Sequence, residues 1–497
     1  MYHKNLKKSK ILNGTKFEKI MKNFRLAKEN IAKGNIEKAV ELCLAAEGRD
    51  FPIRKAVILL AEMYLKDMFS DQLLKKTIQN NKQKMFIVAQ YIIELKKRKV
   101  IDLYKKILEI FPEDSATLTN FSSCCILFGE IEKAFEYSNL AIKKEPRFES
   151  YCNLSICYEA FGDTQKAFEY AQKAYKINNE TISFTYINSL LKQKKFKEGY
   201  DLYFKFYIQN YPNRISQIWL NQKQEMDKTV KVLVDKGYGD AFMFCRYIPF
   251  LAKYFKKIKI EAKDYTYEIF KNNYSDIKNC QVEITKSERN KYGFYTTEKD
   301  TDFSIPILFL PYCLNMDFKK IPDAKGYLKA NEKKVNYFKN KYFNTSKLKV
   351  GICWNCGKNL ERNSTAKFRN CDLENLEKLF DNDKIQFYSF QKDYKQRTEK
   401  YPQIIDFTEE FENFDDTLAA LKNLDLLISV DTSVANLAGA SGVKTFLMLP
   451  KLHDWRWFED KKTTPWYKSV KIFKQTKFNI WTDVIENINK ELKKINI

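Results

Sequence analysis

The sequence predicts a fold in two parts, an α-helical solenoid followed by an α/β region. Two observations predict it. A short turn-and-helix signature recurs through the N-terminal half of the chain. Two later stretches, residues 229–262 and 425–442, each join an apolar strand-like run to a turn and then to an apolar helical run.

The repeated signature reads GNIEKAVEL from Gly34, GEIEKAFEY from Gly129 and GDTQKAFEY from Gly162, and Pro112 and Pro146 close successive units. The last two copies are 33 residues apart. This period, with Gly before and Pro after the second helix, resembles tetratricopeptide repeats. Each hairpin has an apolar face that only a neighbouring repeat can cover, so we expect about five stacked repeats. They either bind peptides or partner proteins, or serve as a rigid spacer or dimerisation arm.

Residues 425–442 read DLLISVDTSVANLAGASG and predict a strand, a turn and a helix. The apolar run suits a buried strand. The next three residues, Asp431, Thr432 and Ser433, are all helix N-cap formers, and Gly442 is expected to end the helix. A helix N-terminus with hydroxyls and unpaired amides attracts anions. An ordinary capped helix in an α/β domain explains the same residues.

Together with the downstream stretch HDWRWFEDKKTTPWYKSVKIFKQ, which begins at His453, this segment resembles bacterial glycosyltransferases with tetratricopeptide repeats. These enzymes are related to heptosyltransferases and more distantly to O-linked N-acetylglucosamine transferase. The resemblance extends back to about Val230. It implies a GT-B fold, in which two Rossmann-like lobes hold a nucleotide-sugar between them. It also implies sugar transfer to a hydroxyl acceptor with inversion. We expect no metal, because a helix dipole and cations can hold the diphosphate, and no other cofactor.

The resemblance and the repeats divide the chain into five segments. We expect a basic leader over residues 1–23, the repeat solenoid over 24–212 and a connector over 213–228. The acceptor-side lobe is expected over 229–345 and the nucleotide-sugar lobe over 346–497. The leader is basic but lacks the apolar core of a signal peptide.

The candidate catalytic base is Asp240, which follows the predicted strand over residues 230–234 and the glycine turn of Gly237 and Gly239. Glycines let the backbone approach a ligand closely. In the resembling heptosyltransferases, the Asp of the matching Gly-Asp pair takes a proton from the acceptor hydroxyl. The resemblance therefore implies that Asp240 is the base, although an Asp that caps the following helix explains the same position.

The candidate donor side lies in the C-terminal lobe. A basic loop after the strand over residues 348–354 carries cations that can neutralise a leaving diphosphate, unless the loop is simply solvated. Asn370 stands where the family has Ser, and Asn436 where it commonly has His. Asn can hydrogen-bond a sugar but cannot relay a proton near neutral pH. The predicted donor-binding residues are Trp354, Lys358, Arg362, Arg369, Gln391, Asp431, Thr432, Ser433, Asn436 and Gly439.

Composition narrows the function classes. The formal charge is +24, but only 12 of the 87 basic residues are Arg and the Lys residues are spread along the chain. That distribution argues against a protein that recognises nucleic acid. The hypothesis of a basic nucleic-acid adaptor is supported by the net charge alone. No run approaches the ~20 apolar residues of a membrane span. Eleven Cys with two His fit free thiols in a reducing, cytoplasmic compartment better than a metal or disulfide framework.

The expected partners are a nucleotide-sugar donor, a protein or glycan acceptor, and a protein bound by the repeats. A second function remains open: a non-catalytic scaffold in which a degenerate transferase fold binds nucleotide-sugar or nothing. Asn436 favours the scaffold, whereas Asp240 and the Asp431–Thr432–Ser433 turn favour the enzyme. The aromatic residues Trp455, Trp457, Trp466 and Tyr467 either stack on a base or sugar, or pack in the core.

Overall fold

The computed structural model describes residues 14–45, 51–95, 97–178, 183–210, 218–220, 224–234, 237–285, 300–316, 321–322, 325–356, 366–392, 398–458 and 462–495. The chain forms two compact units, Met1–Cys157 and Tyr158–Ile497. The division falls within helix α8 (Phe148–Phe161).

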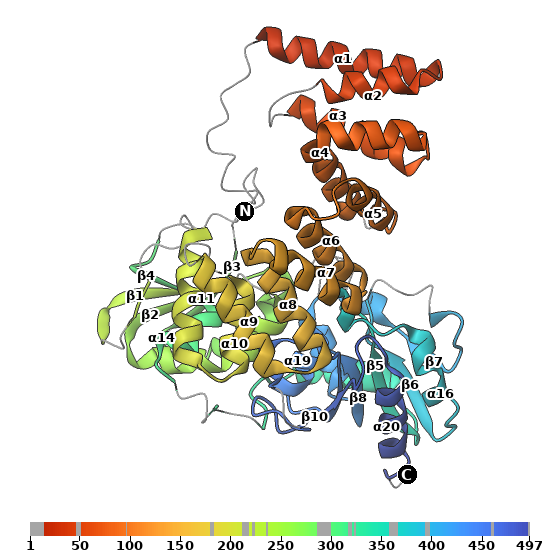
Figure 1. Ribbon diagram of the computed structural model, residues 1–497. Helices are drawn as coiled ribbons and strands as arrows, with labels where there is room; N and C mark the ends of the chain where they lie inside the picture. Colours follow the sequence, from red (N-terminus) through yellow and green to blue (C-terminus); the bar gives the residue numbers. More distant parts are fainter. Residues whose placement is uncertain are drawn as a thin grey trace. The chain divides into compact units, whose positions relative to one another are not determined.

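The first unit is helical throughout its described part (Figure 1). Successive helices run antiparallel and pack as hairpins, with Ala, Val and Leu side chains buried between them. Its helices before α8 are α1 (Gly14–Ala32), α2 (Ile36–Leu44), α3 (Phe51–Leu65), α4 (Asp71–Glu94), α5 (Val100–Ile110), α6 (Ser115–Phe128) and α7 (Ile131–Lys144).

Two features of this unit differ from the expected repeat pattern. Helix α1 begins at Gly14, so helical structure starts within the expected leader. Helix α4 is kinked at Asn81, where φ is −142° and ψ is 40°. The kink divides α4 into two helical segments, which joins two hairpins without a loop.

The glycines that begin the signature, Gly34 and Gly129, have φ of 77° and 79°, which is the left-handed conformation that glycine adopts without strain.

The second unit begins with the remaining repeat helices and continues into two parallel sheets (Figure 1). The repeat helices are α9 (Thr164–Ile177), α10 (Phe184–Lys192) and α11 (Phe196–Asn210). The first sheet has the order β3-β2-β1-β4 and all its pairings are parallel. Its strands are β1 (Glu225–Leu233), β2 (Phe255–Ala262), β3 (Cys280–Ile284) and β4 (Phe303–Pro306).

We call the region around this first sheet the first lobe. Parallel strands need crossover connections, and the described crossovers contain helices. The lobe's helical elements are α12 (Tyr238–Phe244), η2 (Cys245–Lys253), α13 (Asp264–Tyr274), η3 (Ile307–Phe309), α14 (Leu310–Cys313) and α15 (Glu332–Tyr342).

The second lobe is built on a six-stranded parallel sheet with the order β10-β9-β8-β5-β6-β7. This is the strand order of a doubly wound Rossmann fold, which reverses direction between β5 and β8. The strands are β5 (Leu348–Cys353), β6 (Ile385–Ser389), β7 (Ile404–Asp406), β8 (Leu426–Val430), β9 (Thr445–Leu449) and β10 (Val470–Lys474). The helical elements include η5 (Ala366–Arg369), η6 (Leu373–Leu376), α16 (Glu377–Phe380), η7 (Thr408–Glu410), α18 (Phe414–Leu421), α19 (Ser433–Ala440), η8 (Trp455–Trp457) and α20 (Thr482–Leu492).

One hydrophobic core runs through the repeat helices and both lobes of the second unit. Tyr200, Phe204 and Tyr207 of α11 belong to the same buried cluster as Val232 of β1 and Leu447 of β9. A second cluster covers the opposite side of the six-stranded sheet and is closed by α20. The last repeat hairpin is therefore packed as part of the α/β body.

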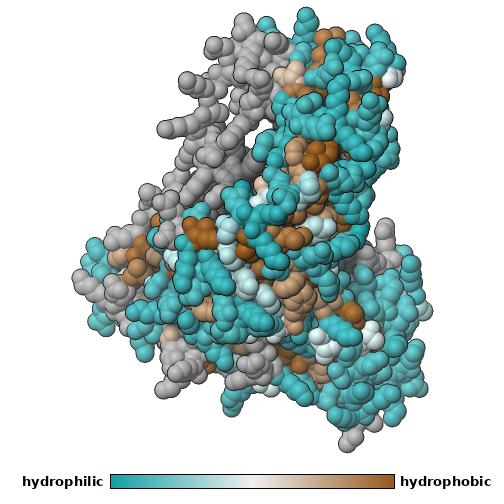
Figure 2. All heavy atoms as spheres, viewed as in Figure 1, coloured by the Kyte–Doolittle hydropathy of each residue, from teal (hydrophilic) through white to brown (hydrophobic). Residues whose placement is uncertain are grey.

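The predicted fold class, a helical repeat solenoid followed by two Rossmann-like lobes, is confirmed. Strand β8 and helix α19 lie where residues 425–442 predict them, and Gly442 has the left-handed φ of 79°. The eleven cysteines are free thiols. No described helix is long and apolar enough to cross a bilayer. The face drawn in Figure 2 is mainly hydrophilic, with scattered apolar patches.

Candidate functional site

Each sheet has a point where its strand order reverses, and ligands of open α/β folds bind outside the carboxyl ends of the strands at such points. In the first lobe this point lies between β1 and β4, and the chain leaving β1 leads to α12 and Asp240. In the second lobe it lies between β5 and β8, and the chain leaving β8 leads to Asp431 and α19.

The two reversal points meet where α12 packs against α19. A β-carbon on Gly239 would lie 3.0 Å from the Asn436 side-chain nitrogen and 3.8 Å from the Ser433 α-carbon. The position therefore admits only a very small residue without a shift. Gly237 differs: it has φ of −63°, and a β-carbon there would meet nothing within 4 Å. Of the two predicted turn glycines, only Gly239 lies at a close approach of the two lobes.

Asp240 forms an ion pair with Arg456 of η8, with 2.8 Å between Oδ1 and Nη2. The other terminal nitrogen of Arg456 lies 2.6 Å from Asp454 Oδ1. Asp454 also accepts a hydrogen bond from the Arg456 backbone N–H at 3.0 Å and so caps η8. We call Asp240, Arg456 and Asp454 the carboxylate–arginine triad. Its side chains are 14–32% exposed, so the triad is recessed but reachable by solvent.

The element that carries Arg456 is held by the last repeat helix. Trp455 packs edge-on against Phe196 and Tyr200 of α11, at centroid distances of 6.5 and 6.1 Å. The Tyr200 hydroxyl donates to the Leu308 carbonyl oxygen of the first lobe at 3.4 Å. Burial raises the pKa of Tyr200 well above its ordinary value, so it stays neutral. Helix α11 thus fixes η8 against the first lobe.

The residue that caps the N-terminus of α19 makes its hydrogen bonds within the second lobe. Thr432 is the N-cap, and its Oγ1 accepts a hydrogen bond from the Ala435 N–H at 3.2 Å. The same hydroxyl lies 3.0 Å from Ser429 Oγ. Ser433, the next residue, is only partly buried. The turn therefore leaves Ser433, rather than Thr432, as the more accessible hydroxyl beside Gly239.

Asn436 is fixed at both ends of its amide. Its Nδ2 donates to the Thr432 carbonyl oxygen at 2.9 Å, and its Oδ1 accepts from the Tyr467 hydroxyl at 3.0 Å. The residue is 5% exposed. This geometry gives Asn436 a structural role in the described protein, whereas its predicted contact with a donor stays a prediction.

Arg369 is the one predicted loop cation within the described residues; Lys358 and Arg362 lie outside them. Its Nη1 pairs with Asp431 Oδ2 at 3.3 Å. Burial alone would lower the pKa of Arg369, but the nearby groups Asp431, Cys356 and Asp454 together raise it. Asn370 accepts a hydrogen bond from the Cys356 N–H at 3.0 Å, so it supports this edge of the lobe.

The remaining predicted donor-side residues pack within the second lobe. Gln391 Oε1 accepts hydrogen bonds from the backbone N–H groups of Trp354 and Asn355 at 3.2 and 2.7 Å, which fixes the end of β5. Trp354 itself is fully buried. A β-carbon on Gly439 would lie 2.5 Å from the Tyr467 ring, so glycine is needed there for packing. Their ligand contacts stay predictions.

Buried Arg246 also connects the lobes. Its guanidinium donates to the carbonyl oxygens of Pro322 and Trp466, at 3.0 and 2.9 Å, and to the Tyr327 hydroxyl at 2.8 Å. Pro322 and Tyr327 belong to the stretch between the two sheets, whereas Trp466 belongs to the second lobe. Arg246 therefore connects η2 by hydrogen bonds both to the stretch between the two sheets and to the second lobe.

The sequence did not single out Arg456, Asp454 or Arg246 as site residues. Arg456 and Asp454 stand inside the resembling HDWRW stretch, so the signal was present, but their partner Asp240 comes from the other lobe. The aromatic residues around them, Trp455, Trp457, Trp466 and Tyr467, are at most 1% exposed. The structure gives them the core-packing role rather than an open stacking surface.

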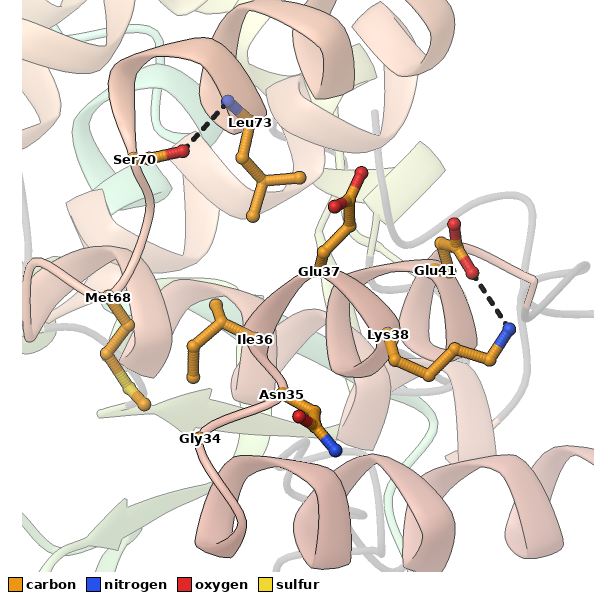
Figure 3. A pocket seen from close by; sticks show the side chains of 9 residues that line it. All are labelled: Gly34, Asn35, Ile36, Glu37, Lys38, Glu41, Met68, Ser70 and Leu73. Atoms are coloured by element: carbon orange, nitrogen blue, oxygen red, sulfur yellow. Dashed lines mark hydrogen bonds and ion pairs between the residues drawn. The ribbon is translucent and has the colours of Figure 1, made fainter.

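A separate pocket of about 640 Å³ lies in the first unit, at the turn before α2 and the start of α4 (Figure 3). Its charged side chains pair with one another or with neighbours, as Lys38 does with Glu41 at 3.0 Å and Glu37 with Lys76 at 3.0 Å. It gathers no set of catalytic groups. Among the described residues, no cluster of three or more His, Cys, Asp or Glu side chains is arranged to hold a metal.

A scan against protein-family models finds no match, and no curated protein matches the sequence. Solved structures do match. The glycosyl transferase family 9 protein of Veillonella parvula is 12% identical over 56% of this chain and 92% of its own, with a TM-score of 0.38. The ADP-heptose lps heptosyltransferase II of E. coli is 12% identical over 53% of this chain and 97% of its own, with a TM-score of 0.35.

A thermophilic TPR protein of Thermus thermophilus is 17% identical over 35% of this chain and 99% of its own, with a TM-score of 0.23. The chain is thus similar, in separate parts, to heptosyltransferase-type glycosyltransferases and to tetratricopeptide-repeat proteins, the two families that its sequence resembles.

Proposed function

We propose that the protein is a glycosyltransferase that moves a sugar from a nucleotide-sugar to a hydroxyl acceptor with inversion. The observation that carries this proposal is the meeting of the two reversal points at Gly239, which brings Asp240 of one lobe beside the N-terminus of α19 in the other. A base from one lobe and an anion-attracting helix terminus from the other are what such a transfer needs.

In the proposed reaction, the Asp240 carboxylate takes the proton of the acceptor hydroxyl as that oxygen attacks the anomeric carbon. The new oxygen–carbon bond forms while the bond from the anomeric carbon to the diphosphate breaks. The nucleoside diphosphate leaves with the electron pair. The α19 amides, the Ser433 hydroxyl and Arg369 stabilise the leaving charge, which requires no metal in this proposal.

The repeats give the proposed enzyme a surface for selecting its acceptor. We infer a protein acceptor or protein partner in the cytoplasm, because stacked helical repeats offer an extended surface for polypeptides. The proposed base at Asp240 requires that the acceptor supply a nucleophile with a removable proton, and we propose that this group is a hydroxyl.

A second candidate function is a non-catalytic scaffold. It is favoured by Asn436, because its amide is engaged by Thr432 and Tyr467 and replaces the histidine common in the resembling family. The recessed Asp240–Arg456 pair favours the enzyme, since burying an ion pair costs free energy that core packing alone does not require.

The test is a panel of nucleotide-sugars scored by thermal shift and by release of nucleoside diphosphate. One nucleotide-sugar that raises the melting temperature and is also hydrolysed or transferred supports the enzyme. Stabilisation without any turnover, in the presence of cell-extract acceptors, supports the scaffold. No stabilisation by any member of the panel contradicts a nucleotide-sugar site altogether.

A further inference from the structure

The Arg456 side chain is shared by two carboxylates. Nη2 faces Asp240 Oδ1 at 2.8 Å, and Nη1 faces Asp454 Oδ1 at 2.6 Å. Asp454 contacts Arg456 a second time, because its carboxylate also accepts a hydrogen bond from the Arg456 backbone N–H. The planar guanidinium therefore has a fixed orientation before it meets Asp240.

Packing confines the guanidinium further. It lies 5.1 Å from the centre of the Trp455 ring and 5.9 Å from that of Phe244, which belongs to the same helix as Asp240. Burial alone would lower the pKa of Arg456, but Asp240 and Asp454 outweigh burial and raise it. The side chain is thus a permanent cation in a place where electrostatic interactions are stronger than in water.

We propose that Arg456 and Asp454 are positioning residues that set the orientation and charge state of Asp240. This inference rests on the proposed function, in which Asp240 is the base. Arg456 holds the Asp240 carboxylate in place and favours its ionised form, which is the form that accepts a proton. If Arg456 interacted with Asp240 alone, however, it would lower the pKa of the Asp240 carboxyl strongly, and the carboxylate would be a poor proton acceptor.

Asp454 offsets that effect. While Asp240 is ionised, the triad carries two negative charges and one positive charge. When Asp240 takes the acceptor's proton, Arg456 is still neutralised by Asp454, so no unpaired charge is left in a recessed site. For Asp454, burial raises the carboxyl pKa but Arg456 outweighs it, and the pKa is held below its ordinary value. The Asp454 carboxylate is therefore ionised near neutral pH.

Within the part of the chain that the structure describes, Tyr200, Tyr203, Tyr467 and Arg369 are among the titratable or charged side chains in electrostatic contact with members of the triad. Burial raises the pKa of Tyr200 and of Tyr467, so neither changes charge near neutral pH. Arg369 remains a cation, paired with Asp431.

The test compares pH profiles of kcat/KM for transfer in the full-length chain. In Arg456→Met the acidic limb is expected to move up by about one to two pH units, because the carboxylate loses its cation. In Asp454→Asn it is expected to move down, because Arg456 then acts on Asp240 alone. Arg456→Lys should resemble wild type in the limb but lose turnover, because an ammonium cannot bridge both carboxylates. Arg147→Met, at a surface Arg paired with Glu145, is the matched control and should not shift the limb.

Opposite shifts in the two variants support the proposal, whereas equal losses of rate with unshifted limbs overturn it. A second measurement needs no activity: urea midpoints of Asp240→Asn, Arg456→Met and the double variant. Coupled side chains give a double variant that loses less than the two single losses combined, and additive losses overturn the proposal. Coupling without any detectable transfer supports the pairing and contradicts the proposed function instead.

Discussion

The Tyr467 hydroxyl donates a hydrogen bond to the Asn436 side-chain oxygen across 3.0 Å, deep inside the second lobe. Asn436 occupies the position where the resembling family commonly has His. Its other amide atom donates to the Thr432 carbonyl oxygen. The pair therefore fixes the first turn of α19, against which Gly239 packs.

Tyr467→Phe should lower the free energy of unfolding by about 1–2 kcal/mol, because it leaves the buried Asn436 oxygen without its donor. Urea denaturation measures the loss. Tyr265→Phe serves as the control, since Tyr265 is half exposed, and should change the stability by less than about 0.5 kcal/mol. Equal effects of the two substitutions would contradict a structural role for the Tyr467–Asn436 bond.

Gly239→Ala should cost both stability and turnover, whereas Gly237→Ala should cost little of either. A methyl group at 239 lies 3.0 Å from the Asn436 amide nitrogen and must displace this hydrogen-bonded amide, but one at 237 meets no atom within 4 Å. Overpacking of this kind costs about 1–3 kcal/mol. Urea midpoints and donor hydrolysis by the two variants provide the comparison. The interpretation fails if the two alanines behave alike.

Thr432→Val and Ser433→Ala should separate helix capping from donor binding. Thr432 accepts the Ala435 N–H, so its replacement should lower stability by about 1 kcal/mol. Ser433→Ala should leave stability unchanged and weaken nucleotide-sugar binding by about 1–3 kcal/mol, the cost of an unpaired charged acceptor. Calorimetry with the nucleotide-sugar that the wild-type protein hydrolyses measures the loss of binding free energy. Unchanged affinity in a folded Ser433→Ala variant would remove this residue from the donor site.

The fragment of residues 228–497 should fold poorly, whereas a fragment of residues 147–497 should fold and keep donor hydrolysis. The shorter fragment lacks α11, whose Tyr200, Phe204 and Tyr207 belong to the core of the lobes. Each such side chain contributes about 1.5–3 kcal/mol by burial. Thermal unfolding followed by circular dichroism compares the folding of the two fragments, and a donor hydrolysis assay compares their activity. Equal cooperativity and equal hydrolysis would show that the repeats are dispensable to the transferase body.

Local sequence patterns predicted the elements but not the partnerships between them. Strand β8, a helix cap among Asp431, Thr432 and Ser433, and the Gly442 stop follow from neighbouring residues, and the structure confirms all three. The kink at Asn81 was not foreseen, because no local breaker such as Pro or Gly marks it. The joining of α11 to the core of the lobes depends on side chains that are distant in sequence.

The candidate site shows the same division. Asp240 was predicted as the base through the family resemblance, whereas the α19 turn was predicted from its own capping residues. Arg456 and Asp454 were not predicted, because the ion pair of Arg456 with Asp240 joins the two lobes and no spacing within one segment reveals it. Lys358 and Arg362 lie outside the described residues and stay predictions.

The most direct test of the central claim is transfer by Asp240→Asn, measured beside its donor affinity in a variant whose folding is checked by urea denaturation. The account predicts that the variant binds the donor like wild type but loses about 10²–10⁴-fold in turnover, because a positioned base contributes that much. Wild-type turnover by a folded Asp240→Asn variant would contradict the assignment of Asp240 as the base.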